Sequence, residues 1–160
     1  MLADHQPEST PMKLSAAASG SPDVIVVGEA LIDVVLSQGG AVEHPGGSPA
    51  NVAYGLARLG VSTGFLTAIG KDDRGNAIRR HLTGAGVELL PGSQSMATTS
   101  TATATLADDG SASYLFDLAW QLAPVTPTYV PKILHTGSIA SFLAPGATGV
   151  KCILQHCAGI

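Results

Sequence analysis

Residues 46–59 contain the groups best suited to bind a small ligand that carries hydroxyl groups. Gly46 and Gly47 let the backbone take positive φ and leave no side chain to keep a ligand away. Asn51 falls in the first turn of the helix that we expect to follow, beside the free N–H groups of the helix start. Its amide offers both a hydrogen-bond donor and an acceptor, as a hydroxyl group requires. These three residues are therefore candidates for a binding site.

Asp33 is a carboxylate inside the apolar run 31–36. Burying a carboxylate is costly unless it gains partners. One interpretation is an aspartate on an edge strand that points to water. The other is a carboxylate that accepts hydrogen bonds from two hydroxyl groups of a ligand. The residue types alone leave both interpretations open.

The helix that positions Asn51 has recognisable start signals. Ser48 is a good N-cap, and Pro49 suits the first helical position, where its missing N–H costs nothing. Helical spacing predicts an apolar face made of Val52, Leu56 and Leu59, with Ala53 and Ala57 between them.

Buried strands are expected on both sides of this helix. Residues 24–27 form a continuous apolar run, and residues 65–69 form a second one. Asp72 or Asp73 is expected to cap a further helix, and the charges of residues 71–74 are most simply a solvated loop. This succession predicts an α/β fold with a mostly parallel sheet flanked by helices.

A pair of antiparallel strands is expected later in the chain. Residues 98–106 alternate small and hydroxyl side chains with period two, residues 108–110 predict a turn, and residues 111–116 predict the return strand. Ala102 and Ala104 are small enough to leave space for a ligand, and Phe116 could close against it. Phe116 as a residue of a small core is the alternative.

The pattern Gly46-Gly47-x-Pro49-x-Asn51-x-Ala53, followed by Gly60 and Gly70, resembles the first signature of the ribokinase/fructokinase (PfkB-type) carbohydrate kinases. Gly-Glu-Ala-Leu-Ile-Asp at 28–33 and Gly-Lys-Asp-Asp-Arg-Gly at 70–75 strengthen the resemblance, which runs from about residue 24 to residue 160. It implies a ribokinase-like fold with a small β lid at about 30–46 and 98–117. Residues 24–160 would be the N-terminal portion of such a sugar kinase domain. Residues 1–23 are expected to be a disordered tail.

The same resemblance implies ATP-dependent phosphorylation of a sugar hydroxyl, with ATP and Mg²⁺ as cofactors. It implies that Asp33 and Asn51 hold sugar hydroxyls, that Gly46 and Gly47 bring the backbone against the sugar, and that Phe116 contacts it. Fructose is favoured by the segments 28–30 and 117–122, while ribose, 2-keto-3-deoxygluconate and nucleosides stay open. Lids of this family can pair between subunits, which implies a possible homodimer.

The catalytic loop of the family, Gly-Ala-Gly-Asp, has no counterpart in this sequence. Residues 83–86 are similar, but Val87 replaces the aspartate, and the segment is expected to end a helix rather than start one. Because helix starts stabilise anions and helix ends do not, we reject this segment as an anion site. We therefore expect the chain to carry the sugar-binding half and to be inactive alone. A non-catalytic sugar-binding or lid-dimerisation module is the alternative.

Composition excludes several other classes. The net charge is −4 and no basic run occurs, which argues against a nucleic-acid partner. No apolar run approaches the roughly 18 residues of a membrane span.

Cys152 and Cys157 fit neither a zinc pair nor a redox pair, so they are expected to be ordinary thiols of a cytoplasmic protein. His44 is expected to be a solvated loop residue.

Overall fold

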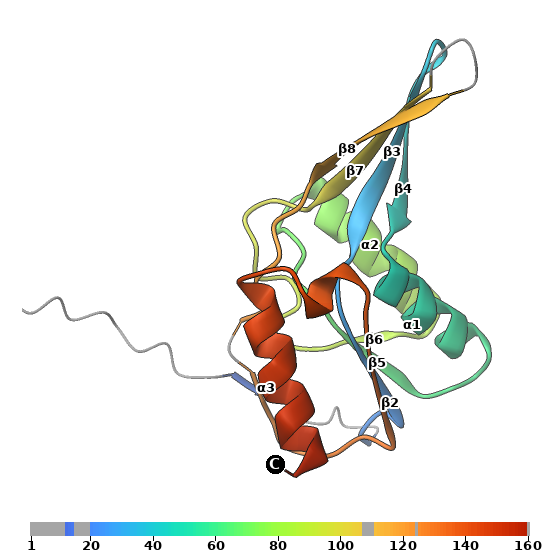
Figure 1. Ribbon diagram of the computed structural model, residues 1–160. Coiled ribbons are helices and arrows are strands. Elements are labelled where there is room, and N and C mark those ends of the chain that lie inside the picture. The colour runs from blue at the N-terminus through green and yellow to red at the C-terminus, as the bar shows by residue number, and fades with distance from the viewer. Residues whose placement is uncertain (1–11, 15–19, 107–110, 124, 160) are drawn as a thin grey trace, which may run out of the picture.

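The computed structural model describes residues 12–14, 20–106, 111–123 and 125–159 (Figure 1). The strands are β1 (Met12–Leu14), β2 (Val24–Val27), β3 (Leu31–Ser37), β4 (Gly40–Gly46), β5 (Thr63–Leu66), β6 (Glu88–Leu89), β7 (Thr101–Leu106), β8 (Ala112–Asp117), β9 (Val125–Pro127) and β10 (Ile133–Thr136). The helices are α1 (Ser48–Arg58), α2 (Asp73–Gly84), α3 (Gly146–Ala158) and the short 3₁₀ helix η1 (Ile139–Ser141).

The central sheet has the strand order β10-β2-β5-β6, and all its pairs are parallel. Alternate residues of β2 face opposite layers. Val24 and Val26 pack in one core with residues of α1 and α2, whereas Ile25 and Val27 pack in another core with α3. Because helices cover both faces of the sheet, β2 and β5 are buried at every position. This arrangement confirms the predicted α/β fold with a parallel sheet covered by helices.

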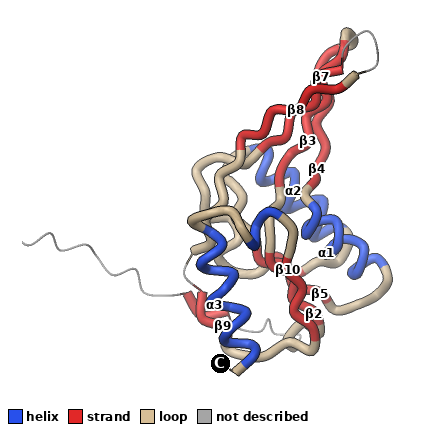
Figure 2. The backbone as a smooth tube through the Cα atoms, in the orientation of Figure 1, coloured by secondary structure: helices blue, strands red, loops and turns tan. Residues whose placement is uncertain are grey.

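A second sheet projects from this core, with the strand order β4-β3-β7-β8 (Figures 1 and 2). We call it the lid sheet. β3 pairs antiparallel with β4 and parallel with β7, and β7 pairs antiparallel with β8. Its strands lie within the segments where the resemblance implied a lid, although the predicted turn at 108–110 lies outside the described residues.

The first turn of α1 differs from the prediction. The N-cap is Gly47 rather than Ser48, and no side chain caps the helix; Ser48 is its first residue and Pro49 its second. The buried positions are Pro49, Ala50 and Ala53, whereas Leu59 is 82% exposed, so the predicted apolar face was wrong at its C-terminal end. Leu59 is the C-cap, one residue beyond the last helical residue Arg58, so it does not continue the buried face. At the other end of α1 the packing is close, since a Cβ at Gly28 would overlap the ring of Pro49.

The start of α2 was predicted correctly in one respect and wrongly in another. Asp72 is the N-cap and its side chain accepts a hydrogen bond from the Gly75 N–H. However, residues 71–74 are not simply a solvated loop, because the side chains of Asp72 and Arg74 bind partners in other elements. The second buried strand, β5, also ends at Leu66, three residues before the predicted end.

Part of the segment expected to be a tail forms a strand, since β1 pairs in parallel with β9. Residues 1–11 and 15–19 of that segment lie outside the described residues. Within the described ranges, no helix combines the length and the apolar character that crossing a membrane requires.

Candidate functional site

A cavity of about 360 Å³ lies between the lid sheet and the carboxyl ends of the central strands. Ligands of open α/β sheets commonly bind at such strand ends. The cavity is lined by residues of the β2–β3 segment, the start of α1, the strands β7 and β8, and the segment after β10. These residues are Glu29, Leu31, Asp33, Gly47, Ser48, Asn51, Ala102, Phe116, Leu118, Ser138 and Ile139.

Four of the five predicted site residues therefore line one cavity: Asp33, Gly47, Asn51 and Phe116. The fifth, Gly46, does not line it. Gly46 lies behind the Asp33 side chain, because a Cβ at position 46 would overlap the Asp33 carboxylate.

Asp33 is placed by the alternation of β3. Ile32 and Val34 are buried in the core with α1 and α2, so the intervening Asp33 side chain points to the other face and is exposed. Within the described part of the chain, its carboxylate has no hydrogen-bond partner in the protein. Partial burial raises the pKa of Asp33 above its ordinary value, and the charge of His44, opposite Asp33 in register on β4, works in the other direction. The carboxylate is thus available as an acceptor.

Gly47 and Asn51 are placed by the start of α1. Gly47 has φ 106°, and a Cβ there would lie 2.7 Å from the Glu29 carbonyl oxygen, so only glycine fits this N-cap. One turn later the Asn51 N–H donates to the Gly47 carbonyl at 2.9 Å. The Asn51 side chain is exposed, and the described residues provide no hydrogen-bond partner for its amide. The amide is free to bind a ligand hydroxyl.

Phe116 reaches the cavity from β8, where it is paired with Ala102 of β7. Ala102 is buried, and its small side chain leaves room beside the 58% exposed Phe116 ring. The Phe116 ring also stacks with Tyr114 at a centroid distance of 6.3 Å. An exposed ring above small residues can close over the apolar face of a ligand.

Glu29 is a lining residue to which sequence reasoning assigned no contact. It is only 9% exposed, and its carboxylate accepts hydrogen bonds from the Ser138 hydroxyl at 3.2 Å and from the Ala140 N–H at 3.1 Å. These bonds hold the segment around η1 against the end of β2 and so shape one wall of the cavity. A Gly-Glu pair directly after a buried strand could have identified Glu29, but its partners lie more than a hundred residues further along the chain.

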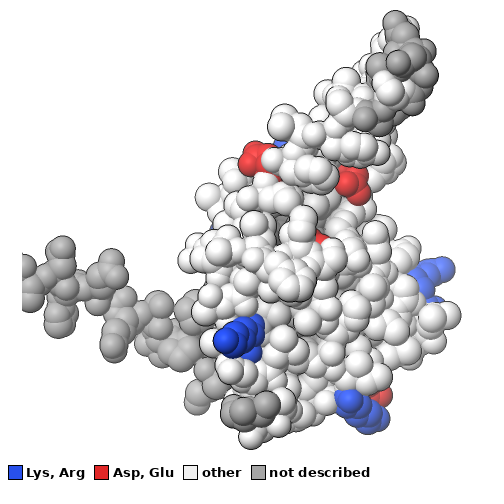
Figure 3. Space-filling model, in the orientation of Figure 1, with Lys and Arg blue, Asp and Glu red and all other residues white. Residues whose placement is uncertain are grey.

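The charge of the site is acidic. Its lining includes two carboxylates and neither lysine nor arginine. On the face seen in Figure 3, Asp and Glu side chains gather mainly where the lid sheet meets the core. Such a cavity favours a neutral hydroxyl-bearing ligand over a phosphate group, because like charges repel.

Two features of the described residues bear on nucleotide and metal binding. No group of three or more His, Cys, Asp or Glu side chains among them is arranged to hold a metal. As predicted, the segment similar to a Gly-Ala-Gly loop ends a helix: α2 stops at Gly84, with Ala85 as its C-cap. Helix C-termini carry partial negative charge and repel phosphate.

A second cavity of similar volume lies between α3 and residues 121–123 with Val125. Its lining contains no carboxylate, histidine, lysine or arginine: it consists of Gln121, Leu122, Ala123, Val125, Pro145, Thr148, Gly149, Cys152 and Ile153. Because few polar groups converge there, it is less suited to orient a hydroxyl-rich ligand than the cavity at Asp33.

Comparison with known proteins gives consistent matches. Residues 21–127 match the model of the pfkB family carbohydrate kinases. The chain is 40% identical over 150 residues to a fructokinase of Escherichia coli, covering 87% of this chain and 49% of that protein. It is 32% identical over 146 residues to a probable chloroplastic fructokinase-6 of Arabidopsis thaliana, covering 78% of this chain and 37% of that protein.

Solved structures agree with these matches. The apo fructokinase of Vibrio cholerae O395 superposes with a TM-score of 0.73 at 26% identity, over 87% of this chain and 50% of that one. The fructokinase of Xylella fastidiosa with bound ATP gives a TM-score of 0.69 at 25% identity, over 86% and 49%. The chain thus spans about half the length of the fructokinases that it matches over most of its own length.

Proposed function

This chain belongs to the pfkB family of carbohydrate kinases, and we propose that its cavity at Asp33 is the sugar-binding site of an ATP-dependent sugar kinase. One observation carries the proposal: Asp33 of β3, Asn51 of α1 and Phe116 of β8 come from three separate elements and line the same cavity. Neither the Asp33 side chain nor the Asn51 side chain forms a hydrogen bond with another described residue.

The chemistry of these groups suits a neutral sugar. The Asp33 carboxylate accepts hydrogen bonds from two adjacent hydroxyl groups, and the Asn51 amide donates to one oxygen and accepts from another. The Phe116 ring covers the C–H face of the sugar. Gly46 leaves the space in which the Asp33 carboxylate sits.

Fructose is the favoured substrate. The fructokinase-like segments 28–30 and 117–122 and the fructokinase relatives support it. The acidic lining disfavours 2-keto-3-deoxygluconate, because that sugar acid carries its own carboxylate. Ribose and nucleosides are the neutral competitors that a binding comparison must include.

Phosphoryl transfer requires a base for the sugar hydroxyl and groups that stabilise the phosphates. We assign no residue of this chain to either task, nor to ATP or Mg²⁺. We therefore propose that these 160 residues, tested by themselves, bind the sugar without catalysing its phosphorylation.

The experiment has two parts. Isothermal titration of the purified chain with D-fructose is expected to give saturable binding, and a coupled assay with ATP and Mg²⁺ is expected to detect no fructose-dependent ADP release. Saturable binding is expected because the acceptor and donor groups are already present in the fold. Steady ADP release that needs both fructose and Mg²⁺ would contradict the absence of turnover, and a lack of saturable binding would contradict the sugar site.

Sugar affinity is expected to fall in acid. A hydroxyl donates to the ionised carboxylate, so bound sugar favours the charged form of Asp33. Because partial burial raises the pKa of Asp33 above its ordinary value, affinity should be full above that raised pKa and should fall as the pH drops through it. Titrations between pH 7 and about pH 4 test this, and Asp33→Asn should bind weakly with a flat pH profile.

Folding stability provides the control for this pH series. A raised pKa means that folding favours the protonated form of Asp33, so the stability that this group contributes is present at low pH and is lost as pH rises through its folded pKa. Asp33 itself therefore does not cause acid unfolding. Loss of affinity that tracks a loss of circular-dichroism signal would contradict the proposed cause.

A lid-dimerisation module is the second candidate. The edge strand β8 exposes three consecutive large apolar side chains, Tyr114, Leu115 and Phe116, at 66%, 71% and 58%. An exposed apolar edge strand can pair with a second copy of the chain. Under this hypothesis, sedimentation equilibrium gives a dimer and Leu115→Lys gives a monomer; a monomeric wild-type chain would contradict it.

A further inference from the structure

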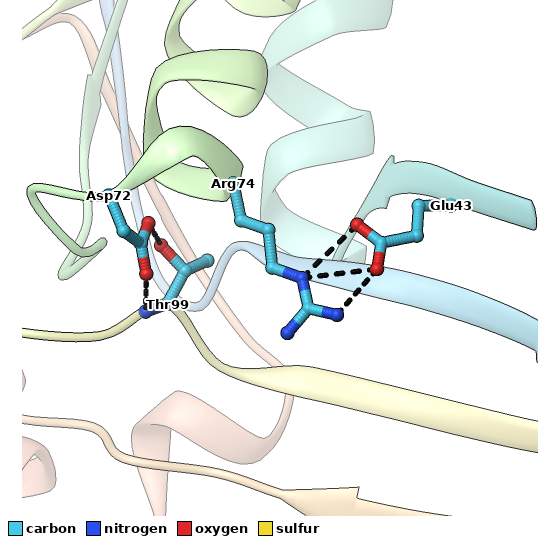
Figure 4. A network of polar contacts seen from close by, with 4 residues as sticks. All are labelled: Glu43, Asp72, Arg74 and Thr99. Carbon is cyan, nitrogen blue, oxygen red and sulfur yellow. Dashed lines mark hydrogen bonds and ion pairs between the residues drawn. The ribbon is translucent and has the colours of Figure 1, made fainter.

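The N-terminal end of α2 binds the strand β4 and the segment just before β7, and the strands β4 and β7 flank β3 (Figure 4). The Asp72 carboxylate accepts hydrogen bonds from the Thr99 N–H at 2.8 Å and from the Thr99 hydroxyl at 2.6 Å. Thr99 lies two residues before β7, and its hydroxyl oxygen also accepts from the Gly70 N–H at 3.0 Å. One carboxylate thus joins the helix cap to the base of β7.

The other flanking strand is bound two residues further along the same turn. Arg74 forms a two-pronged ion pair with Glu43 of β4, in which the Arg74 Nε lies 3.1 Å from Glu43 Oε2 and Nη2 contacts Oε1. Glu43 is paired with Val34, the residue after Asp33. We call Asp72, Arg74, Thr99 and Glu43 the α2 clamp.

The α2 clamp lies on either side of the strand that carries Asp33. β3 is hydrogen-bonded to β4 on one side and to β7 on the other, and Asp33 is paired with His44 and Ala102. The buried face of β3 packs in the same core as Ile78 and Leu82 of α2. The helix therefore holds the strand through its apolar face and holds both neighbouring strands through the clamp.

The same helix also contacts the element that carries Asn51. His81 of α2 stacks on Tyr54 of α1, with ring centroids 4.5 Å apart and planes within 5° of parallel. α2 is thus in contact with α1 through this stack and with the lid sheet through the clamp.

We propose that Asp72 and Arg74 are positioning residues that hold the lid sheet on α2 and thereby fix the spacing between Asp33 and Asn51. The expected effect on sugar binding rests on the proposed sugar site, whereas the clamp itself is defined by contacts within the chain. Neither residue lines the cavity, so both act through the strands that they bind.

The charge states agree with this arrangement. Partial burial of Asp72 opposes ionisation, but hydrogen bonds from Thr99 and Gly75 outweigh it and lower the pKa of Asp72 below its ordinary value. The hydrogen bond from Arg74 likewise lowers the pKa of Glu43; desolvation opposes this, and the charge of Arg74 adds to the lowering. Because the Arg74–Glu43 pair is about 40% exposed, it adds little to the free energy of unfolding. Its contribution is geometric.

The variant Asp72→Asn distinguishes the role of Asp72 in the clamp from its role as the helix cap. Asparagine caps a helix as well as aspartate does, but its NH₂ group would face the Thr99 N–H, donor against donor. Hydrogen–deuterium exchange is expected to be about tenfold faster for the amides of β7 and β8 and unchanged for those of β2 and β5. D-fructose affinity is expected to fall about tenfold. Asp73→Asn, with the same charge change in the same turn, should stay within about twofold on both measurements.

Arg74→Met tests the second half of the clamp, with Arg79→Met on the exposed side of the same helix as its control. The charge reversal Glu43→Arg with Arg74→Glu should restore part of the protection that either single change removes. Uniformly faster exchange throughout Asp72→Asn, or unchanged exchange in the lid sheet, would overturn the proposal. If Asp72→Asn accelerates lid exchange but the wild-type chain binds no fructose, the sugar site is wrong and the clamp stands only as a brace of the lid.

Discussion

Replacing Asp33 by alanine is expected to raise the fructose concentration for half-saturation by about 100-fold or more, without unfolding the chain. Hydrogen bonds to a charged acceptor contribute about 1.5–3 kcal/mol each, and Asp33 is proposed to accept two. The side chain is exposed and unpaired among the described residues, so its loss removes little packing. Isothermal titration measures the affinity, and thermal unfolding measures the stability.

Two matched variants make this prediction specific. Asp33→Asn keeps the size but loses the charge, and should retain only weak binding; Asp73→Ala removes a carboxylate outside the cavity and should bind like the wild type. In a kinase-competent protein that contains these residues, Asp33→Ala should leave ATP binding nearly intact. Equal losses for both ligands would remove Asp33 from the proposed role.

Replacing Gly46 by alanine is expected to weaken fructose binding nearly as much as the loss of Asp33 itself. The added Cβ would overlap the Asp33 carboxylate, which is the flexible end of an exposed side chain. The side chain can turn away, so the chain should still fold, but the acceptor leaves its place in the cavity. We expect a loss of affinity of about 30-fold or more, with an unfolding temperature within about 3 °C of the wild type.

A double-mutant cycle tests the cause. If Gly46 acts only by making room for the Asp33 carboxylate, adding Gly46→Ala to Asp33→Ala should change fructose affinity by less than about twofold. Independent losses that multiply would instead mean that the Gly46 backbone contacts the sugar directly, as the family resemblance implied. The cycle thus decides between the two roles for this glycine.

Local sequence signals predicted several of the helices and strands around the site. The apolar run of β2, the capping of α2 by Asp72, one of two predicted caps, and the antiparallel pair β7–β8 depend on residues close together in the chain, and the structure confirms them. The glycine signature also identified the family correctly. The roles of the residues in the cavity stay predictions.

Features that depend on tertiary packing were beyond sequence reasoning. Leu59 is exposed because α1 ends at Arg58, a boundary that helical periodicity does not reveal. Glu29 and Asp72 bind partners that lie 111 and 27 residues further along the chain. The residues next to each carboxylate in the sequence do not identify those partners.

The most direct test of the sugar site is a titration of the ¹⁵N-labelled chain with D-fructose, followed by amide chemical shifts. We predict saturable shifts concentrated at Asp33, Gly47, Asn51 and Phe116, which are absent in Asp33→Ala at the same sugar concentrations. Shifts that never saturate, or that centre on the second cavity beside α3, would contradict the proposal that this chain binds sugar at Asp33.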